Sequence, residues 1–292
     1  MSQAGTPRPQ PLRRWPKTLG MLATAAVIIG AVLLVDARWS RVPEIPGSLA
    51  HYVALMGRGV LANPLGDPES AYWSSAFRLM IESLHIAWLG TLIGALISLP
   101  MGFLAAANVS PAPVVFMTRQ ILNGIRAIPE IILAIAVMLP IFGLGPLAGA
   151  MALGVGAVGT LGKLTSEVIE GIDLGPVEAA RASGAGYLQI LRWGVLPQVL
   201  PETVAFWLYR FEINIRASAI LGVLGAGGIG SLLSQLFRIR AWDRIGITLT
   251  VIILVTIMID QISARVRQRI ITGDTRGSAA PVPPAVQAEA SV

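Results

Sequence analysis

Long apolar stretches fill most of this sequence, and they limit its possible folds more than any other feature. Residues 19–35 form an uninterrupted run of 17 apolar or small residues. Further apolar stretches cover residues 76–107, 114–142, 147–169, 203–224 and 245–262. Lipid offers no hydrogen bonds to the backbone, so a spanning segment must be a helix of about 20 residues or a strand of a closed barrel. The lengths predict an all-α, polytopic membrane protein with about six transmembrane helices.

The composition supports this class and excludes several others. Hydrophobic residues make up 54% of the chain and charged residues 13%, whereas soluble domains have about a quarter of their residues charged. The chain has no cysteine, so disulfides, thiolate metal sites and cysteine nucleophiles are excluded. His51 and His85 lack the spacing of metal ligands, and neither is assigned a role. Much of the net charge of +6 lies near the two termini, which indicates contact with anionic membrane lipid rather than nucleic acid.

The segments outside the main apolar region have distinct characters. Residues 1–18 are rich in proline and arginine, which predicts a disordered cytoplasmic tail. Residues 19–35 are interpreted as an N-terminal transmembrane anchor. A signal peptide is the alternative, because residues 35–37 resemble a cleavage site, but the run is longer than a signal usually has. Residues 36–75 are interpreted as an external segment, with an amphipathic helix over 51–61 at the membrane surface. Residues 76–272 form the predicted transmembrane domain, and 273–292 a second disordered cytoplasmic tail.

The positions of basic residues give the orientation. Basic clusters precede residue 19 and follow the last predicted span, at Arg265, Arg267 and Arg269. Lys and Arg are enriched on the cytoplasmic side of membrane proteins. Six spans with both termini in the cytoplasm agree with these clusters, and the same count puts residues 173–200 on the cytoplasmic side.

A polar, helix-prone interruption occupies residues 173–197. Asp173 is suited to cap a helix, Pro176 to the first turn, and Glu178 to the positive end of the helix dipole. Gly184, with Gly186, is expected to end that helix. A second short helix is predicted over 187–196, and Pro197 and Pro201 are expected to mark its end and the start of the next element.

This interruption resembles the loop of ATP-binding-cassette (ABC) importer permeases, which has the form E-A-A-x-x-x-G, nine residues, then I-x-L-P. The matching positions are Glu178, Ala179, Ala180, Gly184, Leu196 and Pro197. Gly194 stands where the family usually has an aliphatic residue. The resemblance implies that this loop docks on a separate ATPase subunit and couples it to the permease.

Charged residues inside the predicted spans need an explanation, because each costs about 2.5–3.5 kcal/mol at a bilayer centre on insertion scales. Three sets have opposite charges at i, i+4 spacing, where the two groups can neutralise each other. They are Arg126 with Glu130, Lys163 with Glu167, and Glu212 with Arg216. For Lys163 and Glu167, and for Asp260, a structural ion pair or a place at the interface explains the charge equally well.

The other charged residues of the spans, together with the polar Asn214, are candidates for a substrate pathway. The candidates are Arg126, Glu130, Arg210, Glu212, Asn214 and Arg216. Pro129 is expected to break the third span and to start a second half-helix, whose N-terminus suits an anion. The span over 203–224 carries polar residues on two faces. It is therefore expected to be surrounded by protein, with one face toward a dimer axis or a water-filled cavity.

Residues 209–216, followed by the glycine-rich run 221–230, resemble the permease of phosphonate importers, and the resemblance covers about residues 75–272. It implies a type I importer fold with a methionine-importer-like core, in the bacterial inner membrane. It also implies a second permease copy (a homodimer is the simpler arrangement) and two cytoplasmic ATPase subunits that bind ATP and Mg. An external binding protein, periplasmic or a lipoprotein, would deliver a phosphonate or a related phosphorus oxyanion such as phosphate or phosphite. Methionine-importer permeases share the glycine run and the layout, and stay open as an alternative.

The glycine run also satisfies the dinucleotide-binding pattern G-x-G-x-x-G, but it lies between membrane spans and not in a βαβ unit. It is interpreted as a tight external connection near a gate or binding-protein contact, at Gly225, Gly227, Gly228 and Gly230. No P-loop pattern occurs in the sequence, so the chain is expected to bind no cofactor and to lack catalysis of its own. A proton-driven transporter that uses Asp260 or Glu130 as carrier and, more distantly, a membrane-bound enzyme are the alternatives from other classes.

Overall fold

The computed structural model describes residues 15–35, 39–62 and 69–272, and all regular secondary structure in these ranges is helical. The predicted tail over 273–292 and most of the tail over 1–18 lie outside the described residues. Contacts divide the chain into two units, Met1–His51 and Tyr52–Val292.

The first unit contains α1 (Trp15–Leu34) and a 3₁₀ turn, η1 (Trp39–Glu44). α1 begins four residues before the predicted anchor. Its side chains are exposed along the helix, including Leu33 at 78% and Leu34 at 87%. A helix that is apolar on all sides is suited to lipid.

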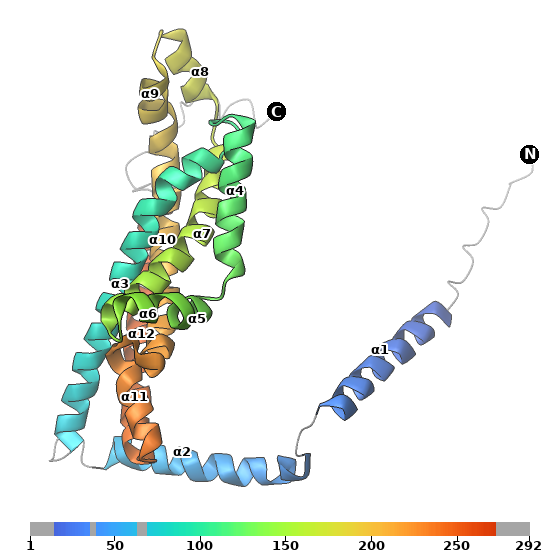
Figure 1. The fold of residues 1–292 in the computed structure, drawn as a ribbon, viewed down its shortest axis with the longest axis vertical. Coiled ribbons are helices and arrows are strands. Elements are labelled where there is room, and N and C mark those ends of the chain that lie inside the picture. The colour runs from blue at the N-terminus through green and yellow to red at the C-terminus, as the bar shows by residue number, and fades with distance from the viewer. Residues whose placement is uncertain (1–14, 36–38, 63–68, 273–292) are drawn as a thin grey trace, which may run out of the picture. The chain divides into compact units, whose positions relative to one another are not determined.

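The second unit is a helical bundle whose long helices are α3 (Glu69–Ala105), α7 (Pro146–Glu170), α10 (Leu196–Leu221) and α12 (Trp242–Thr272). In the described ranges, four helices including α1 are long and apolar enough to cross a membrane, and the number rises to six if two bent helix pairs each count as one span. α8 and α9 lie at one end of the unit, called here the loop end, and α11 lies at the other, the α11 end (Figure 1).

Small residues bring α3 and α7 close together. A Cβ added at Gly90 would lie 2.8 Å from the Cβ of Leu153, and one at Gly94 would lie 2.5 Å from the Cβ of Ala157. Close backbone approach through glycine and alanine is the usual way in which membrane helices gain packing energy without a hydrophobic driving force. The glycine-rich fourth span, α7, therefore packs closely against α3.

The third span is broken, as Pro129 predicted. α4 (Ala112–Ala127) ends before Ile128, and a second helical segment runs from Glu130 to Phe142 at 86° to it. That segment consists of α5 (Glu130–Leu133), a π-turn η2 (Ala134–Met138) and α6 (Leu139–Phe142). α5 and α6 lie across the middle of the second unit, between its two ends (Figure 1).

The segment over 225–244 is more than a connection, because residues 228–238 form α11 (Gly228–Arg238). α10 continues through a π-turn, η4 (Gly222–Ala226), and the chain bends by 58° before α11. Gly225, Gly227 and Gly228 have φ of 103°, 79° and 67°, which side chains with a Cβ rarely adopt. The glycine run thus makes a bend between two helices.

At the α11 end, α2 (Ile45–Leu61) crosses the start of α12. α2 is six residues longer at its N-terminus than the predicted helix over 51–61. A Cβ added at Gly59 would overlap the backbone of Asp243, and one at Gly246 would overlap the backbone of Met56. The two helices meet through glycines on both sides of the crossing, and the rings of Tyr52 and Trp242 lie 4.6 Å apart beside it.

The polar interruption folds as two short helices, α8 (Gly175–Ala182) and α9 (Tyr187–Ile190), around Gly184. The next helix starts at Leu196, as Pro197 predicted, but the second short helix does not stop there. α9 continues through a π-turn, η3 (Leu191–Val195), directly into α10. Pro197 lies in the first turn of α10, next to the π-turn, where the regular hydrogen-bond pattern is already interrupted and its missing N–H costs little.

Candidate functional site

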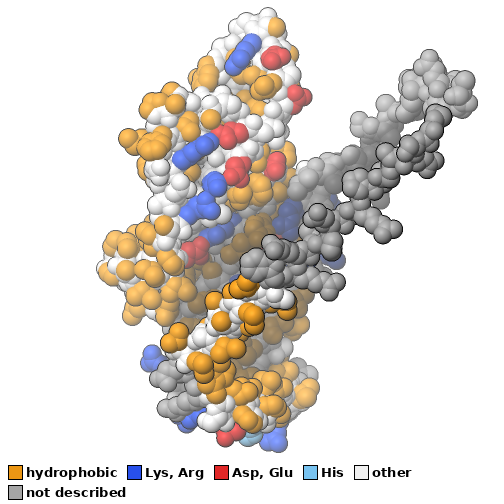
Figure 2. Space-filling view, turned by 90° about the vertical axis from the view of Figure 1, so that its right-hand side faces the viewer, with side chains coloured by type: hydrophobic (Ala, Val, Ile, Leu, Met, Phe, Trp, Pro, Cys, Tyr) orange, Lys and Arg blue, Asp and Glu red, His pale blue; other side chains and the backbone are white. Residues whose placement is uncertain are grey.

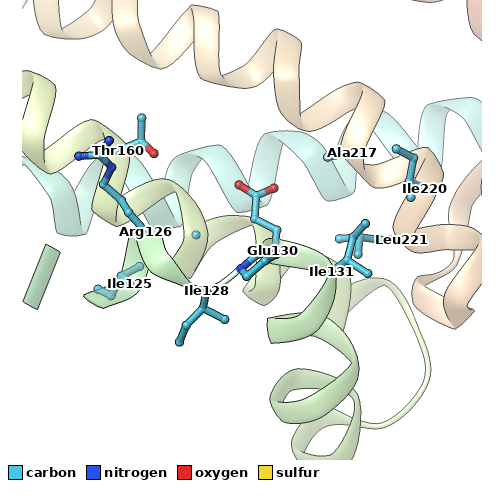
Figure 3. A pocket seen from close by; sticks show the side chains of 11 residues that line it. Ile125, Arg126, Ile128, Glu130, Ile131, Thr160, Ala217, Ile220 and Leu221 are labelled. Atoms are coloured by element: carbon cyan, nitrogen blue, oxygen red, sulfur yellow. The ribbon is translucent and has the colours of Figure 1, made fainter. Parts of the chain in front are cut away.

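A cavity of about 350 Å³ lies where the broken third span faces α7 and α10. Its lining is mixed, with two charged side chains among apolar ones, and Figure 3 shows most of it. The lining residues are Ile125, Arg126, Ile128, Pro129, Glu130, Ile131, Gly156, Thr160, Ala217, Ile220 and Leu221. Residues on both sides of the break at Pro129 line this space, and the chain changes direction there by 86°.

Glu130 is paired across the cavity wall and not within its own span. Its carboxylate accepts a hydrogen bond from Nη2 of Arg210 on α10, and the Arg210 side chain is only 9% exposed. The i, i+4 pairing predicted for Arg126 and Glu130 is wrong. The 86° bend between them removes the shared helix face on which that pairing depends.

Arg126 has no ion-pair partner among the described residues, and its side chain lines the cavity near Thr160 (Figure 3). With Glu130 and Arg210 neutralising each other, the cavity keeps one uncompensated positive charge from this chain. Arg126 is also exposed, so its guanidinium is accessible for charge-assisted hydrogen bonds to an anion in the cavity. The arrangement is therefore suited to an anion.

Two glycines of α7 make room for these charged side chains. A Cβ at Gly156 would lie 2.7 Å from Cγ of Glu130, and a Cβ at Gly159 would lie 2.7 Å from Cγ of Arg126. Sequence reasoning missed both residues as part of the site. No local pattern in the sequence indicates which side chains would pack against these glycines.

The other polar residues of α10 contact neighbouring helices. Glu212 pairs with Arg267 of α12 at 3.5 Å, and Arg216 pairs with Asp260 of α12 at 2.8 Å. The i, i+4 pairing predicted for Glu212 and Arg216 is therefore wrong, because each finds its partner on α12.

Asn214 donates to Oγ1 of Thr91 on α3 at 2.9 Å. The polar residues of α10 thus face three neighbours, α3, α5 and α12. The helix is only partly covered, with Tyr209 49% and Ile220 54% exposed, so the expectation that protein surrounds it is met in part. Of the six pathway candidates, Arg126 and Glu130 line the cavity within the described residues, and Arg210 joins it through Glu130.

Between the cavity and the loop end, α4 and α7 carry a second group of charges. Lys163 and Glu167 form the predicted pair within α7 at 3.5 Å, and Arg119 pairs with Glu170 at 2.5 Å. These four residues line a smaller cavity of about 240 Å³. Figure 2 shows a column of basic and acidic side chains along one face of the molecule, among apolar surroundings.

At the loop end, the motif positions lie on one structural unit. Glu178, Ala179 and Ala180 are on α8, Gly184 forms the bend with φ of 77°, and Leu196 and Pro197 begin α10. Val177 is buried against η3, and a Cβ at Gly194 would lie 3.3 Å from its Cα. Gly194 therefore lets η3 approach α8 closely, which explains why an aliphatic residue is absent there.

The glycine run is held by α3. The N–H of Gly228 donates to Oε1 of Glu82 at 3.0 Å, and the N–H of Ile229 donates to Oγ of Ser83 at 2.9 Å. These contacts satisfy free N–H groups at the start of α11 and place a carboxylate at its positive end. Glu82 and Ser83 were not predicted, because a cap from a distant helix leaves no local pattern in the sequence.

Residues 98–271 match the family model described as "Binding-protein-dependent transport system inner membrane component". The chain belongs to this family, whose members are the permeases of ABC importers. This permease is 38% identical to the phosphite transport system permease protein PtxC of Stutzerimonas stutzeri, over 87% of this chain and 90% of that protein. It is 41% identical to the phosphate-import permease protein PhnE of Mycolicibacterium smegmatis, over 67% of this chain but 37% of the relative.

The fold agrees with this family. The permease superposes on a chain from inward-facing structures of the MetNI methionine ABC transporter with a TM-score of 0.62 and 26% sequence identity. The match covers 99% of that chain and 70% of the permease. The predicted methionine-importer-like core is confirmed, and the remaining part of the permease extends beyond that core.

Proposed function

We propose that this permease carries phosphonates or related phosphorus oxyanions, such as phosphate and phosphite, across the bacterial inner membrane. The observation that carries the proposal is the uncompensated guanidinium of Arg126 in a cavity of about 350 Å³ between the two ends of the bundle. Relatives named for phosphite and phosphate transport support it. The substrate's negative charge would supply the counter-charge that the cavity lacks.

The transport energy comes from outside the chain in this proposal. Two cytoplasmic ATPase subunits hold ATP and Mg, and each docks on the loop of one permease copy in a homodimer. An external binding protein, periplasmic or lipid-anchored, delivers the substrate at the α11 end, near the glycine run. Both termini lie in the cytoplasm. Exposed apolar side chains around α8 and α9, Leu174 at 54% and Leu188 at 77%, are suited to contact another protein.

The motion from the ATPase reaches the cavity through the helices on either side of the loop. α7 directly precedes the loop. It carries Gly156 and Gly159, which pack against the side chains of Glu130 and Arg126. α10 leaves the loop and carries Arg210. A shift of α8 that tilts α7 against α10 would change the distance between Arg210 and Glu130, and so open or close the anion site.

Two alternative functions, a proton-driven transporter and a methionine permease, fit the site less well. Both carboxylates considered as proton carriers are held by arginines, Glu130 by Arg210 and Asp260 by Arg216. A methionine substrate is compatible with relatives named D-methionine permease, at 30% identity. Methionine is a zwitterion, however. Its carboxylate could pair with Arg126, but its ammonium group would keep the net charge of the cavity positive.

Reconstitution tests this proposal. The permease, its cognate ATPase and its binding protein are placed in proteoliposomes, and ATP hydrolysis and uptake are measured with methylphosphonate, phosphate, phosphite and methionine. We expect stimulation by at least one phosphorus oxyanion. Stimulation by methionine alone would refute the substrate assignment, and failure of the permease to associate with any ATPase would refute the proposed assembly.

A further inference from the structure

Glu170, the last residue of α7, connects three segments at the loop end. Its Oε1 accepts hydrogen bonds from Nη2 of Arg119 on α4 at 2.5 Å and from the backbone N–H of Ala107 at 2.6 Å. The Nε of Arg119 also donates to the carbonyl oxygen of Ala105 at 3.0 Å. One carboxylate oxygen thus joins the base of the loop to α4 and to the turn between α3 and α4.

The same turn contacts the loop on its other side. The side-chain amide of Asn108 donates to the carbonyl oxygen of Ile169 at 2.6 Å, and the hydroxyl of Tyr187 donates to the carbonyl oxygen of Val109 at 3.3 Å. A buried apolar cluster fills the space between the turn and the loop. It contains Ala106, Ile169, Val177, Val195 and Val199. A movement of the loop must therefore either carry the turn between α3 and α4 with it or break these contacts.

α4 extends this connection to the cavity. Arg119 and Arg126 lie seven residues apart on this helix, which is two turns and roughly 10 Å along its axis, so their side chains share one face. The helix is continuous between them and ends at the break before Pro129. A force applied at Arg119 is thus transmitted to Arg126, and the break allows α4 to shift without moving α5 equally.

We propose that Glu170 is a positioning residue that ties α4 to the loop, so that movement of the loop sets the position of the Arg126 guanidinium in the cavity. This route would operate beside the direct routes through α7 and α10. The proposal rests on the proposed function of the loop and cavity, and it adds a specific connection between them.

The ion pair between Arg119 and Glu170 is partly exposed, so its role in coupling can be tested apart from any role in folding. The side chains of Arg119 and Glu170 are 44% and 32% exposed. Ion pairs at this exposure contribute little to folding stability. Loss of the pair is therefore expected to leave the permease folded and assembled, and to change how its parts move together.

The α7 helix itself supplies a matched control. Glu167 lies three residues before Glu170 and pairs with Lys163 of the same helix at 3.5 Å, so its pair makes no connection to α4. In proteoliposomes with ATPase and binding protein, methylphosphonate uptake is compared with ATP hydrolysis. We expect Glu170→Ala and Arg119→Ala each to lower the number of molecules carried per ATP by about threefold or more.

Further variants sharpen the comparison. The double variant Glu170→Ala/Arg119→Ala should be no worse than either single one, because both act on one connection. Arg119→Lys keeps the charge and should retain most of the coupling, and Glu167→Ala should stay within about twofold of the parent chain. An unchanged transport ratio in Glu170→Ala, or an equal loss in Glu167→Ala, would overturn the proposal.

A distance measurement tests the connection without relying on uptake. The chain has no cysteine, so spin labels can be placed at Asn123→Cys on α4 and Gly171→Cys at the loop base. In the assembled complex, we expect the distance between them to stay constant on ATP binding, and to shift or broaden with Glu170→Ala. A constant distance in both proteins would overturn the connection. Absence of ATPase binding by the parent chain would instead count against the proposed function.

Discussion

Arg210 of α10 forms an ion pair with Glu130 of the broken third span, and this pair joins residues that are 80 positions apart in the chain. The Arg210 side chain is 9% exposed and that of Glu130 is 26% exposed. Neither charge could lie at this depth alone without a large cost. The pair therefore fixes the broken span against α10, and it leaves Arg126 as the free charge of the cavity among the described residues.

Removing one member of this pair should destabilise the permease more than removing both. Glu130→Ala leaves the Arg210 charge buried without a partner, which costs about 3–5 kcal/mol. We expect the double variant Glu130→Ala/Arg210→Met to recover much of that loss. Thermal unfolding of the purified variants in detergent measures both effects.

The half-exposed pair of Lys163 and Glu167 provides the control for that experiment. Glu167→Ala should change stability by about 1 kcal/mol or less, because an exposed pair within one helix contributes little. Equal losses in Glu130→Ala and Glu167→Ala would contradict a buried, interdependent pair between α5 and α10.

The free charge of Arg126 should govern anion transport. We expect Arg126→Ala to lower uptake of the phosphorus oxyanion by about tenfold or more, since a charge-assisted hydrogen bond contributes about 1.5–3 kcal/mol. Uptake in proteoliposomes and co-purification of the ATPase are measured side by side, and the complex should still assemble.

Arg216 allows a direct comparison, since the sequence grouped it with Arg126. Its Nη2 lies 2.8 Å from Oδ2 of Asp260, on the α12 side of α10. Arg216→Ala should therefore lower uptake less than Arg126→Ala does. The opposite order would move the substrate pathway away from the cavity at the break and toward the α10–α12 interface.

Gly156 of α7 packs against Glu130, and we expect that it cannot be replaced even by alanine without loss of stability. A Cβ at Gly156 would lie 2.7 Å from Cγ of Glu130, so Gly156→Ala should displace that carboxylate and cost about 1–3 kcal/mol by overpacking. At Gly124 on α4, an added Cβ would have no described atom within 4 Å. Gly124→Ala should be neutral or stabilising by up to about 1 kcal/mol, and thermal unfolding distinguishes the two.

The sequence was informative where a local pattern determines structure. The apolar stretches predicted the spans, Pro129 the break, and Gly184 the bend between α8 and α9, because each depends on the chain within a few residues of itself. The charge pairs were predicted less well. The i, i+4 rule applies to Lys163 and Glu167, which stay on one uninterrupted helix.

The same rule failed for Arg126 with Glu130 and for Glu212 with Arg216. The first pair is separated by the 86° bend, and the second finds partners on α12 at Asp260 and Arg267. Those partners depend on how whole helices pack, and one sequence contains no local signal for that. The close contacts of Gly156 with Glu130 and of Gly159 with Arg126 were missed for the same reason.

The bend at Gly184 permits a test that separates backbone strain from steric bulk. Gly184 has φ of 77°, and an added Cβ there would meet no described atom within 4 Å. Gly184→Ala therefore adds only the conformational cost of a left-handed residue, about 1–2 kcal/mol at an exposed site. Gly184→Trp adds the same cost together with a large side chain on the surface that we propose the ATPase covers.

We expect both variants to fold, and only Gly184→Trp to lose the ATPase or the coupling of hydrolysis to uptake. Thermal unfolding shows whether the two variants have similar stability, and co-purification with the ATPase shows whether docking is affected. Equal loss of ATPase binding in both variants would assign the effect to the backbone at the bend. Normal coupled transport by Gly184→Trp would show that this surface of the loop is free of the ATPase, because an indole would not fit within a closely packed protein interface without displacing it.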